Sequence, residues 1–247
     1  MSAKYAQETI KPYSATGDKG PQVEAMFDNI APTYDRLNHL LSFGIDRYWR
    51  KAALKRLKKY QPQEILDMAT GTGDFALMAL NILKPKHLLG ADLSEGMLTV
   101  AREKAKKTGA LNIDFQKEDC MNLTLPDNHF DAVTVAYGVR NFPDLERGLK
   151  EMLRVLKPSG HLVIIELTTP QKFPMKQLFN IYSHYIMPFF GRLLSKDRQA
   201  YEYLPATMAA FPQGEVMKEI LEKCGYENVS FKRYTAGLST FYIAEKQ

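Results

Sequence analysis

The sequence predicts an α/β protein built on a doubly wound, Rossmann-like sheet. Between residues 65 and 167, short apolar runs alternate with longer segments of helical periodicity. The first apolar run leads into the turn Gly71-Thr-Gly73 and then directly into a helical segment. Strand and helix units in succession require crossover connections, which make neighbouring strands parallel. With 247 residues and 45% hydrophobic content, the chain can bury one large core, and no shift in composition marks a second domain.

The N-terminal part precedes the sheet. Residues 1–21 contain two prolines and two glycines among mostly polar side chains and predict a flexible leader. Residues 22–247 then form a single domain, which opens with a helical cap over residues 22–60. Helical periodicity within this cap predicts a short helix over 22–29 and a longer one over 46–59.

Five strands and three helices follow. Apolar runs bounded by turn-forming residues predict strands over 65–69, 88–93, 113–116, 130–136 and 161–167. Helical periodicity between the strands predicts helices over 74–83, 94–107 and 144–156, and Ser94 is suited to cap the second of these. The turn-forming residues Pro158-Ser-Gly160 precede the fifth strand.

The C-terminal third departs from this alternation. Residues 168–212 form an insertion after the fifth strand, and connections of that length usually serve a function. Segment 173–194 is strongly apolar, which fits either a buried helix that completes the core or an apolar lid over a binding site. A helix over 213–224 follows, and strands over 229–234 and 239–244 predict an antiparallel C-terminal hairpin.

The composition narrows the class of protein. No stretch reaches the roughly 18 consecutive apolar residues of a transmembrane helix, and the N-terminus lacks an apolar signal core, so we expect a cytoplasmic protein. Only two cysteines are present, Cys120 and Cys224, and we expect both to be reduced. The net charge of +5 is modest and the lysines are spread over helix faces, which gives nucleic-acid binding little support. The histidines show no metal-ligand spacing, so no metal site is expected.

The turn at Gly71 and Gly73 indicates a nucleotide-type cofactor. Glycine lets the backbone bend tightly and approach a ligand, and the helix that follows presents unpaired N–H groups. With Asp92 at the end of the second strand, where a carboxylate can accept hydrogen bonds from ribose hydroxyls, the turn formally fits a dinucleotide site. Acidic Asp67 and Asp74 flank the turn, however, and would repel a pyrophosphate while attracting a cationic group. S-adenosylmethionine, a sulfonium cofactor, therefore fits better than NAD.

A second carboxylate suits the adenine of that cofactor. Glu118-Asp119-Cys120 follows the third strand, and Asp119 could accept a hydrogen bond from the adenine amino group. In isolation Asp119 resembles a solvated loop acid, but its place after a strand in this order favours a ligand role.

Three further blocks of residues carry a resemblance. They are residues 34–49, which begin Tyr34-Asp35-Arg-Leu-Asn38-His39, then Tyr137-Gly-Val-Arg140-Asn141, and residues 154–166. With these blocks, the chain from about Phe27 to Ala244 resembles the class I S-adenosylmethionine-dependent methyltransferases of the menaquinone and ubiquinone biosynthesis family. The sequence departs from the family pattern most clearly at Asp46, where the family often has histidine.

The resemblance implies C-methylation of a prenylated quinol. Conversion of a demethylmenaquinol to menaquinol is the first expectation, and methylation of a benzoquinol in ubiquinone biosynthesis is the alternative. The resemblance also implies that the cofactor is contacted by Thr70, Asp92, Asp119 and Cys120. Spacing alone would assign another group to ordinary helix and turn positions, but the resemblance makes them site residues: Tyr34, Asp35 and Asn38.

The chemistry of such a transfer points to two more residues. A ring carbon becomes nucleophilic when its phenol is deprotonated, so the site must align that carbon and stabilise the phenolate. Arg140 and Asn141 follow the fourth strand, at the edge where open α/β sheets bind ligands, and the Arg140 guanidinium could stabilise the phenolate. Because arginine stays charged, a separate proton acceptor is needed, which we expect to be Asp35, His39 or a water held by them.

A prenylated quinol resides in the membrane. The apolar insertion is therefore expected to dock transiently on the inner face of the cytoplasmic membrane. Basic residues that flank it could contact anionic headgroups: Lys172, Lys176, Arg192, Lys196 and Arg198.

Three classes of function stay open here: a methyltransferase, an NAD-dependent oxidoreductase and a non-catalytic cofactor-binding protein. The ring type, the tail length and the choice between monomer and homodimer stay open as well.

Overall fold

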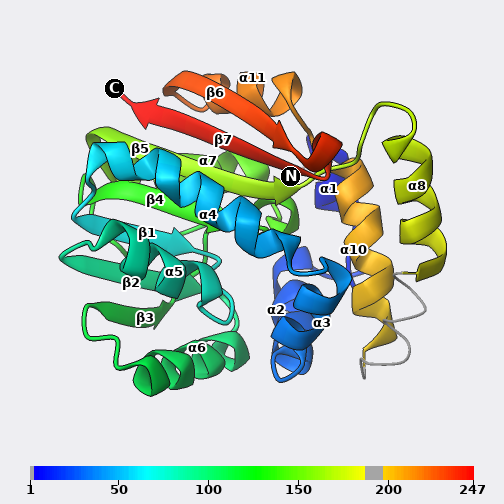
Figure 1. The fold of residues 1–247 in the computed structure, drawn as a ribbon, viewed down its shortest axis with the longest axis horizontal. Coiled ribbons are helices and arrows are strands. Elements are labelled where there is room, and N and C mark those ends of the chain that lie inside the picture. Colours follow the sequence, from blue (N-terminus) through cyan, green and yellow to red (C-terminus); the bar gives the residue numbers. More distant parts are fainter. Residues whose placement is uncertain (1–2, 187–196) are drawn as a thin grey trace.

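The computed structural model describes residues 3–186 and 197–247. Its centre is a seven-stranded sheet in the order β3-β2-β1-β4-β5-β7-β6 (Figure 1). Strands β1 to β5 pair in parallel, whereas β7 runs antiparallel to both β5 and β6. The strands are β1 (Glu64–Met68), β2 (His87–Asp92), β3 (Ile113–Lys117), β4 (Phe130–Ala136), β5 (Leu156–Leu167), β6 (Tyr226–Tyr234) and β7 (Ser239–Lys246). The predicted α/β class and its C-terminal hairpin are confirmed.

β5 is longer than its sequence pattern predicts. The turn-forming residues Pro158 to Gly160 lie within the strand instead of ahead of it. The pairing of β4 with β5 shifts register there, between the pairs Phe130 with Leu156 and Ala132 with His161. Ser159 takes the left-handed backbone conformation, with φ of 63°. The turn residues therefore form an irregularity inside the strand, which a local pattern reads as a break.

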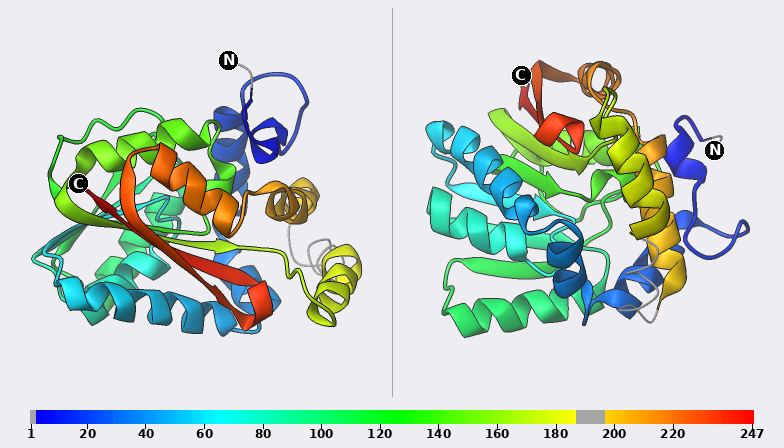
Figure 2. Two further views of the ribbon diagram at one scale, coloured as in Figure 1. Left: turned by 90° about the horizontal axis from the view of Figure 1, so that it is seen from above. Right: turned by 45° about the vertical axis from the view of Figure 1, so that its right-hand side comes forward.

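Helices cover both faces of the sheet (Figures 1 and 2). On one face α4 (Ile45–Leu57) and α5 (Asp74–Leu83) bury a core cluster that includes Trp49, Leu54 and Phe75. On the other face α7 (Leu145–Val155) and α11 (Glu215–Lys223) bury a cluster that includes Leu149 and Met217. α6 (Glu95–Thr108) packs along β2 and β3, and its predicted cap is present, because the Ser94 hydroxyl accepts the Met97 N–H at 3.1 Å.

The structure shows helices and buried contacts within residues 3–21, the predicted leader. Residues 3–21 contain the short helix α1 (Ala6–Thr9) and the start of α2 (Lys19–Ile30). Gln7, Glu8 and Lys19 are buried, and the Glu8 carboxylate accepts the Leu145 N–H at 2.9 Å. Buried polar groups hold this segment in place, and such contacts leave no apolar periodicity for sequence reasoning to detect.

Helices α2 and α3 (Tyr34–Leu41) of the cap lie with the insertion at the carboxyl ends of the parallel strands (Figure 1). The cap helix α3 is one that the sequence pattern did not predict. The insertion supplies α8 (Met175–Ile181), a π-helical turn at Tyr182–Ile186 and α10 (Arg198–Ala210). Two of the basic residues expected at a membrane, Arg192 and Lys196, lie outside the described residues. Among the helices of the described chain, none is long and apolar enough to cross a membrane.

Candidate active site

The turn after β1 brings the backbone close to a ligand position. Gly71 and Gly73 both have positive φ, 57° and 80°. A Cβ atom on Gly73 would lie 3.0 Å from the Ala101 Cβ, so that position is closed to side chains. A Cβ on Gly71 would meet no heavy atom of the described chain within 4 Å. The Gly71 backbone thus borders open space, as a cofactor turn requires.

Asp92 joins this turn to the end of β2. One carboxylate oxygen accepts the Gly71 N–H at 2.8 Å, and the other accepts the Ser94 N–H at 2.9 Å. Burial raises the pKa of Asp92 to about 6. Each oxygen keeps a further lone pair, so the carboxylate can still accept hydrogen bonds from a ribose diol.

Asp67 lines the small pocket at the turn and is also hydrogen-bonded within the protein. The structure buries it beneath the turn, where its oxygens accept hydrogen bonds from the hydroxyls of Thr70 at 2.7 Å and Thr134 at 2.6 Å. Burial raises the pKa of Asp67 to about 6. Asp67 therefore ties the Thr70 side of the turn to β4, and the Thr70 hydroxyl donates to Asp67 and keeps only acceptor capacity for a ligand.

Two carboxylates follow β3: Glu118 is buried and hydrogen-bonded within the protein, and Asp119 is exposed. Glu118 is buried and accepts hydrogen bonds from Gln116 at 2.7 Å and from the Thr124 N–H at 2.8 Å. Asp119 is exposed and uses one oxygen to accept the Met121 N–H at 2.8 Å. Burial, followed by the negative charges of Asp119 and Asp92, raises the pKa of the Cys120 thiol. Asp119 is thus the acid of this loop that a cofactor could reach.

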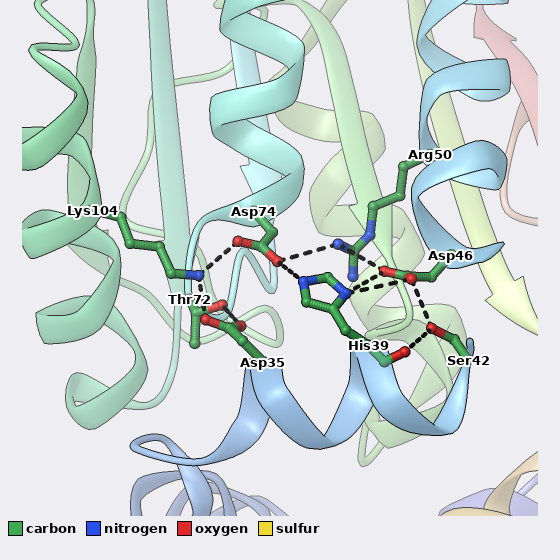
Figure 3. A network of polar contacts seen from close by, with 8 residues as sticks. All are labelled: Asp35, His39, Ser42, Asp46, Arg50, Thr72, Asp74 and Lys104. Atoms are coloured by element: carbon green, nitrogen blue, oxygen red, sulfur yellow. Dashed lines mark hydrogen bonds and ion pairs between the residues drawn. The ribbon is translucent and has the colours of Figure 1, made fainter. Parts of the chain in front are cut away.

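A network of charged and polar side chains links α3 to the glycine turn (Figure 3). Asp35 accepts a hydrogen bond from Thr72 of the turn at 2.5 Å and pairs with Lys104 of α6. Lys104 also contacts Asp74 at 2.6 Å. Burial opposes ionisation of Asp74, but the hydrogen bond and charge of Lys104, with the charges of Arg50 and His39, lower its pKa overall. The acid that was expected to attract a cationic cofactor is thus already paired within the protein.

His39 occupies the centre of the same network. Its Nε2 lies 3.3 Å from Asp74, and its Nδ1 lies 3.3 Å from Asp46. Arg50 of α4 contacts both carboxylates, at 3.3 Å from Asp46 and 3.4 Å from Asp74 (Figure 3). Asp46, the position that departs from the family pattern, is therefore a buried partner of both His39 and Arg50.

A large apolar cavity opens beside this network. Its volume is about 630 Å³, within the range of cavities that bind small molecules. Its wall includes residues of α2, α3, α4, α8 and α10. The apolar lining includes Met26, Phe27, Ile30, Leu41, Phe43, Trp49, Met175, Leu178, Phe179, Leu204 and Met208.

The polar groups of this cavity centre on Arg140. Arg140 lies in the 3-10 turn after β4, Val139–Asn141, and its guanidinium donates to Glu166 at 2.6 Å and to the Tyr137 carbonyl. Glu166 is fully buried and also accepts the Leu167 N–H at 2.8 Å. The carboxylate and the carbonyl fix the plane of the guanidinium, so that Arg140 meets the cavity in one orientation.

Several buried polar atoms at the cavity wall have no hydrogen-bond partner within the part of the chain that the structure describes. They are Arg140 Nε, Asn141 Oδ1 and the Tyr203 hydroxyl. Unpaired buried polar atoms are costly, so their gathering in one cavity indicates a ligand with oxygen atoms. Sequence reasoning missed Tyr203, Glu166 and Arg50 as site residues. Only Glu166 carried a signal, since it stood within a matched block.

The turn and the cavity meet through shared residues. A small pocket at the turn is lined by Thr70, Gly71, Thr72, Asp35, His39 and Asp74. Four residues line both this pocket and the large cavity: Tyr34, Asn38, Arg50 and Tyr137. Asp35 and His39 belong to the turn side only, which does not favour the expectation that either takes a proton directly from a molecule in the cavity. The arrangement suits transfer of a group from a ligand at the turn to one in the cavity.

Comparison with known proteins identifies the family to which this chain is related. The model of the ubiE/COQ5 methyltransferase family matches residues 15–246. A demethylmenaquinone methyltransferase of Bacteroides fragilis is 59% identical over 98% of this chain and 99% of its own length. Another from Porphyromonas gingivalis is 42% identical over 97% and 98%. A ubiquinone/menaquinone biosynthesis C-methyltransferase of Geobacter sulfurreducens is 41% identical over 93% and 90%.

Solved structures share the fold at low sequence identity. A SAM-dependent methyltransferase of Thermotoga maritima, described as a possible histamine N-methyltransferase, has a TM-score of 0.63 and 21% identity over 90% of this chain and 99% of its own. The [4+2]-cyclase SpnF has a TM-score of 0.64 and 17% identity over 92% and 96%. These neighbours confirm the predicted fold class. Their differing chemistry leaves the activity to be argued from the site and the family.

Proposed function

Because this chain belongs to the ubiE/COQ5 methyltransferase family, we propose that it transfers a methyl group from S-adenosylmethionine to a ring carbon of a prenylated quinol. Conversion of a demethylmenaquinol to menaquinol is favoured by the relatives, since the protein at 59% identity carries that name. One observation of the site carries the proposal: an apolar cavity of about 630 Å³ has unpaired polar atoms in its wall and meets the glycine turn through shared residues.

The residues at the turn suit S-adenosylmethionine. Asp92 would accept the ribose hydroxyls, Asp119 the adenine amino group, and the open space at Gly71 would admit the backbone-facing part of the cofactor. Bound there, this cofactor supplies an electrophilic methyl group on a positively charged sulfur. Family membership separates the protein from NAD-dependent oxidoreductases, and a methyl-transfer assay separates it from a non-catalytic binding protein.

Arg140 is suited to activate the ring. Its charge would stabilise the phenolate that makes the neighbouring ring carbon nucleophilic. Glu166 and the Tyr137 carbonyl occupy one end of the guanidinium, while Nε stays unpaired at the cavity. Asn141, whose amide offers both a hydrogen-bond acceptor and donors, is suited to bind a ring oxygen beside Arg140.

The cavity also suits a long isoprenoid tail. Two of its lining side chains are strongly exposed, Phe43 at 83% and Leu178 at 56%, and they mark an apolar opening. Phe173, Ile181 and Tyr185 are exposed on the same insertion as Leu178. We propose that the tail leaves the cavity between Phe43 and α8 and that this rim contacts the membrane surface, aided by exposed Lys172 and Lys176. Flotation with liposomes tests this contact, and absence of binding with or without anionic lipid would contradict it.

The activity is tested by labelled methyl transfer. The protein is incubated with methyl-labelled S-adenosylmethionine and either reduced demethylmenaquinone or a reduced benzoquinone analogue, and extracted products are identified by mass spectrometry. We expect label on the naphthoquinol ring carbon. Label on the benzoquinol alone would move the assignment to ubiquinone biosynthesis, and label on neither ring would overturn the proposed function.

A further inference from the structure

Asp46 is the buried acid that lines the apolar cavity on the side of the charged network. It lies in the first turn of α4, and its buried Oδ2 lies 3.3 Å from both His39 Nδ1 and an Arg50 guanidinium nitrogen. Its Oδ1 accepts the Ser42 hydroxyl at 2.7 Å. His39, Arg50 and Ser42 therefore hold the Asp46 carboxylate in place, and because each of its oxygens has two lone pairs it keeps acceptor capacity beyond these contacts.

The network behind Asp46 provides a path away from the cavity (Figure 3). His39 Nδ1 lies 3.3 Å from Asp46, and His39 Nε2 lies 3.3 Å from Asp74 on the other side of the ring. Asp74 in turn contacts Lys104, and the side chains of His39, Asp74 and Lys104 are each about a quarter exposed, at 26%, 27% and 24%. A proton that reaches His39 is thus beside water.

The charges of the network leave room for that proton. The residues drawn in Figure 3 include three carboxylates, Asp35, Asp46 and Asp74, and two permanent cations, Arg50 and Lys104. With a neutral His39 the group carries one net negative charge, and with an imidazolium it carries none. An imidazolium would also donate from both nitrogens to carboxylates, which can only accept.

We propose that Asp46 is the proton acceptor of the methyl-transfer site and that His39 relays the proton to the surface. This inference rests on the proposed function. The ring hydroxyl's O–H bond breaks and an O–H bond forms on Asp46, which leaves the phenolate facing Arg140. The C–H proton that the methylated ring carbon must lose then balances the proton that restores this hydroxyl, so one proton leaves the site in each turnover. Asp46 then passes the proton to His39 Nδ1, and His39 releases its Nε2 proton to Asp74 or water. The expectation of a direct role for His39 is thereby replaced by a role behind Asp46.

The chain offers a matched set of variants. Asp46→Asn removes the acceptor but keeps the size of the side chain, and His39→Gln interrupts the relay. Asp114→Asn serves as the control, because it makes the same chemical change at an exposed acid of β3 that lines neither the cavity nor the pocket at the turn. All variants are compared with the native protein for binding of S-adenosylhomocysteine by calorimetry, which we expect to change less than threefold in Asp46→Asn.

The decisive measurement compares two substrates. One is a short-tailed demethylmenaquinol, and the other is its ring-fluorinated analogue, whose hydroxyl is more acidic and needs less help to ionise. Asp46→Asn should lose about 10²- to 10⁴-fold in kcat on the first substrate and at least tenfold less on the second. His39→Gln should show the same pattern with smaller losses, and Asp114→Asn should stay near the native rate on both.

Two results would overturn the inference. One is native turnover by Asp46→Asn, and the other is an equal loss on both substrates with cofactor binding intact, which would indicate a structural role. Both results are compatible with the proposed function. That function is contradicted only if the native protein methylates neither quinol.

Discussion

Removal of the Arg140 guanidinium should separate its catalytic role from its structural role. Arg140→Met leaves the buried Glu166 carboxylate with only the backbone N–H groups of Leu167 at 2.8 Å and of residue 140 at 3.2 Å. Breaking a buried ion pair costs about 3–5 kcal/mol, because one charge stays buried without its partner. For a chain of this size that loss corresponds to a fall in Tm of roughly 6–20 °C.

The double variant Arg140→Met with Glu166→Gln removes both charges and should recover most of this stability. Its activity should not recover. Loss of an electrostatic stabiliser at developing negative charge costs about 10²- to 10³-fold in kcat. Thermal unfolding followed by circular dichroism and methyl transfer to demethylmenaquinol measure the two effects, and calorimetry with S-adenosylhomocysteine confirms that the turn is intact. A stable double variant with kcat/KM within tenfold of the native value would refute the electrostatic role.

Three further predictions concern Asp92, Tyr203 and Glu146. Because burial raises the pKa of Asp92 to about 6, affinity for S-adenosylhomocysteine should fall below that pH by up to about tenfold per pH unit, and calorimetry with Asp92→Asn should show weaker binding that no longer changes there. Tyr203→Phe removes an unpaired hydroxyl at the cavity and should raise the KM for the quinol about tenfold without lowering Tm, so an unchanged KM would exclude Tyr203 from ring recognition. Hydrogen bonds from Lys223, Lys4 and Tyr5 lower the pKa of Glu146 to about 2, so its stabilisation is full above pH of about 4.5 and is lost as the pH falls toward 2. Glu146→Gln should therefore lower the free energy of unfolding by about 1 kcal/mol at pH 7 and by less at pH 3, and urea titrations with an equal loss at both pH values would contradict this assignment.

Local patterns were sufficient for the elements of the sheet. The predicted strand over 130–136 matches β4 at both ends, because its apolar run is bounded by turn residues on either side. The glycine turn was equally accessible, since φ of 57° and 80° at Gly71 and Gly73 is the conformation that glycine favours.

The site could be predicted only where it lies on those local patterns. Asp92 ends β2 and Arg140 lies in the turn that follows β4, and the carboxyl ends of parallel strands meet at one edge of the sheet. Tyr203 gave no comparable signal, because it reaches the cavity from α10, a helix that the insertion brings back to the cap. Asp46 was noted only as a departure from the family pattern, since the sequence does not show that α3 and α4 place His39 beside it.

The central claim is that the glycine turn and the apolar cavity form one methyl-transfer site across Tyr34, Asn38, Arg50 and Tyr137. A crystal structure with S-adenosylhomocysteine and a short-tailed menaquinone analogue tests it most directly. We predict the cofactor at Asp92 and the turn, the aromatic ring beside Arg140 and Asn141, and the tail leaving past Phe43. A ring bound outside this cavity, or a cofactor separated from the ring by the protein wall, would contradict the claim.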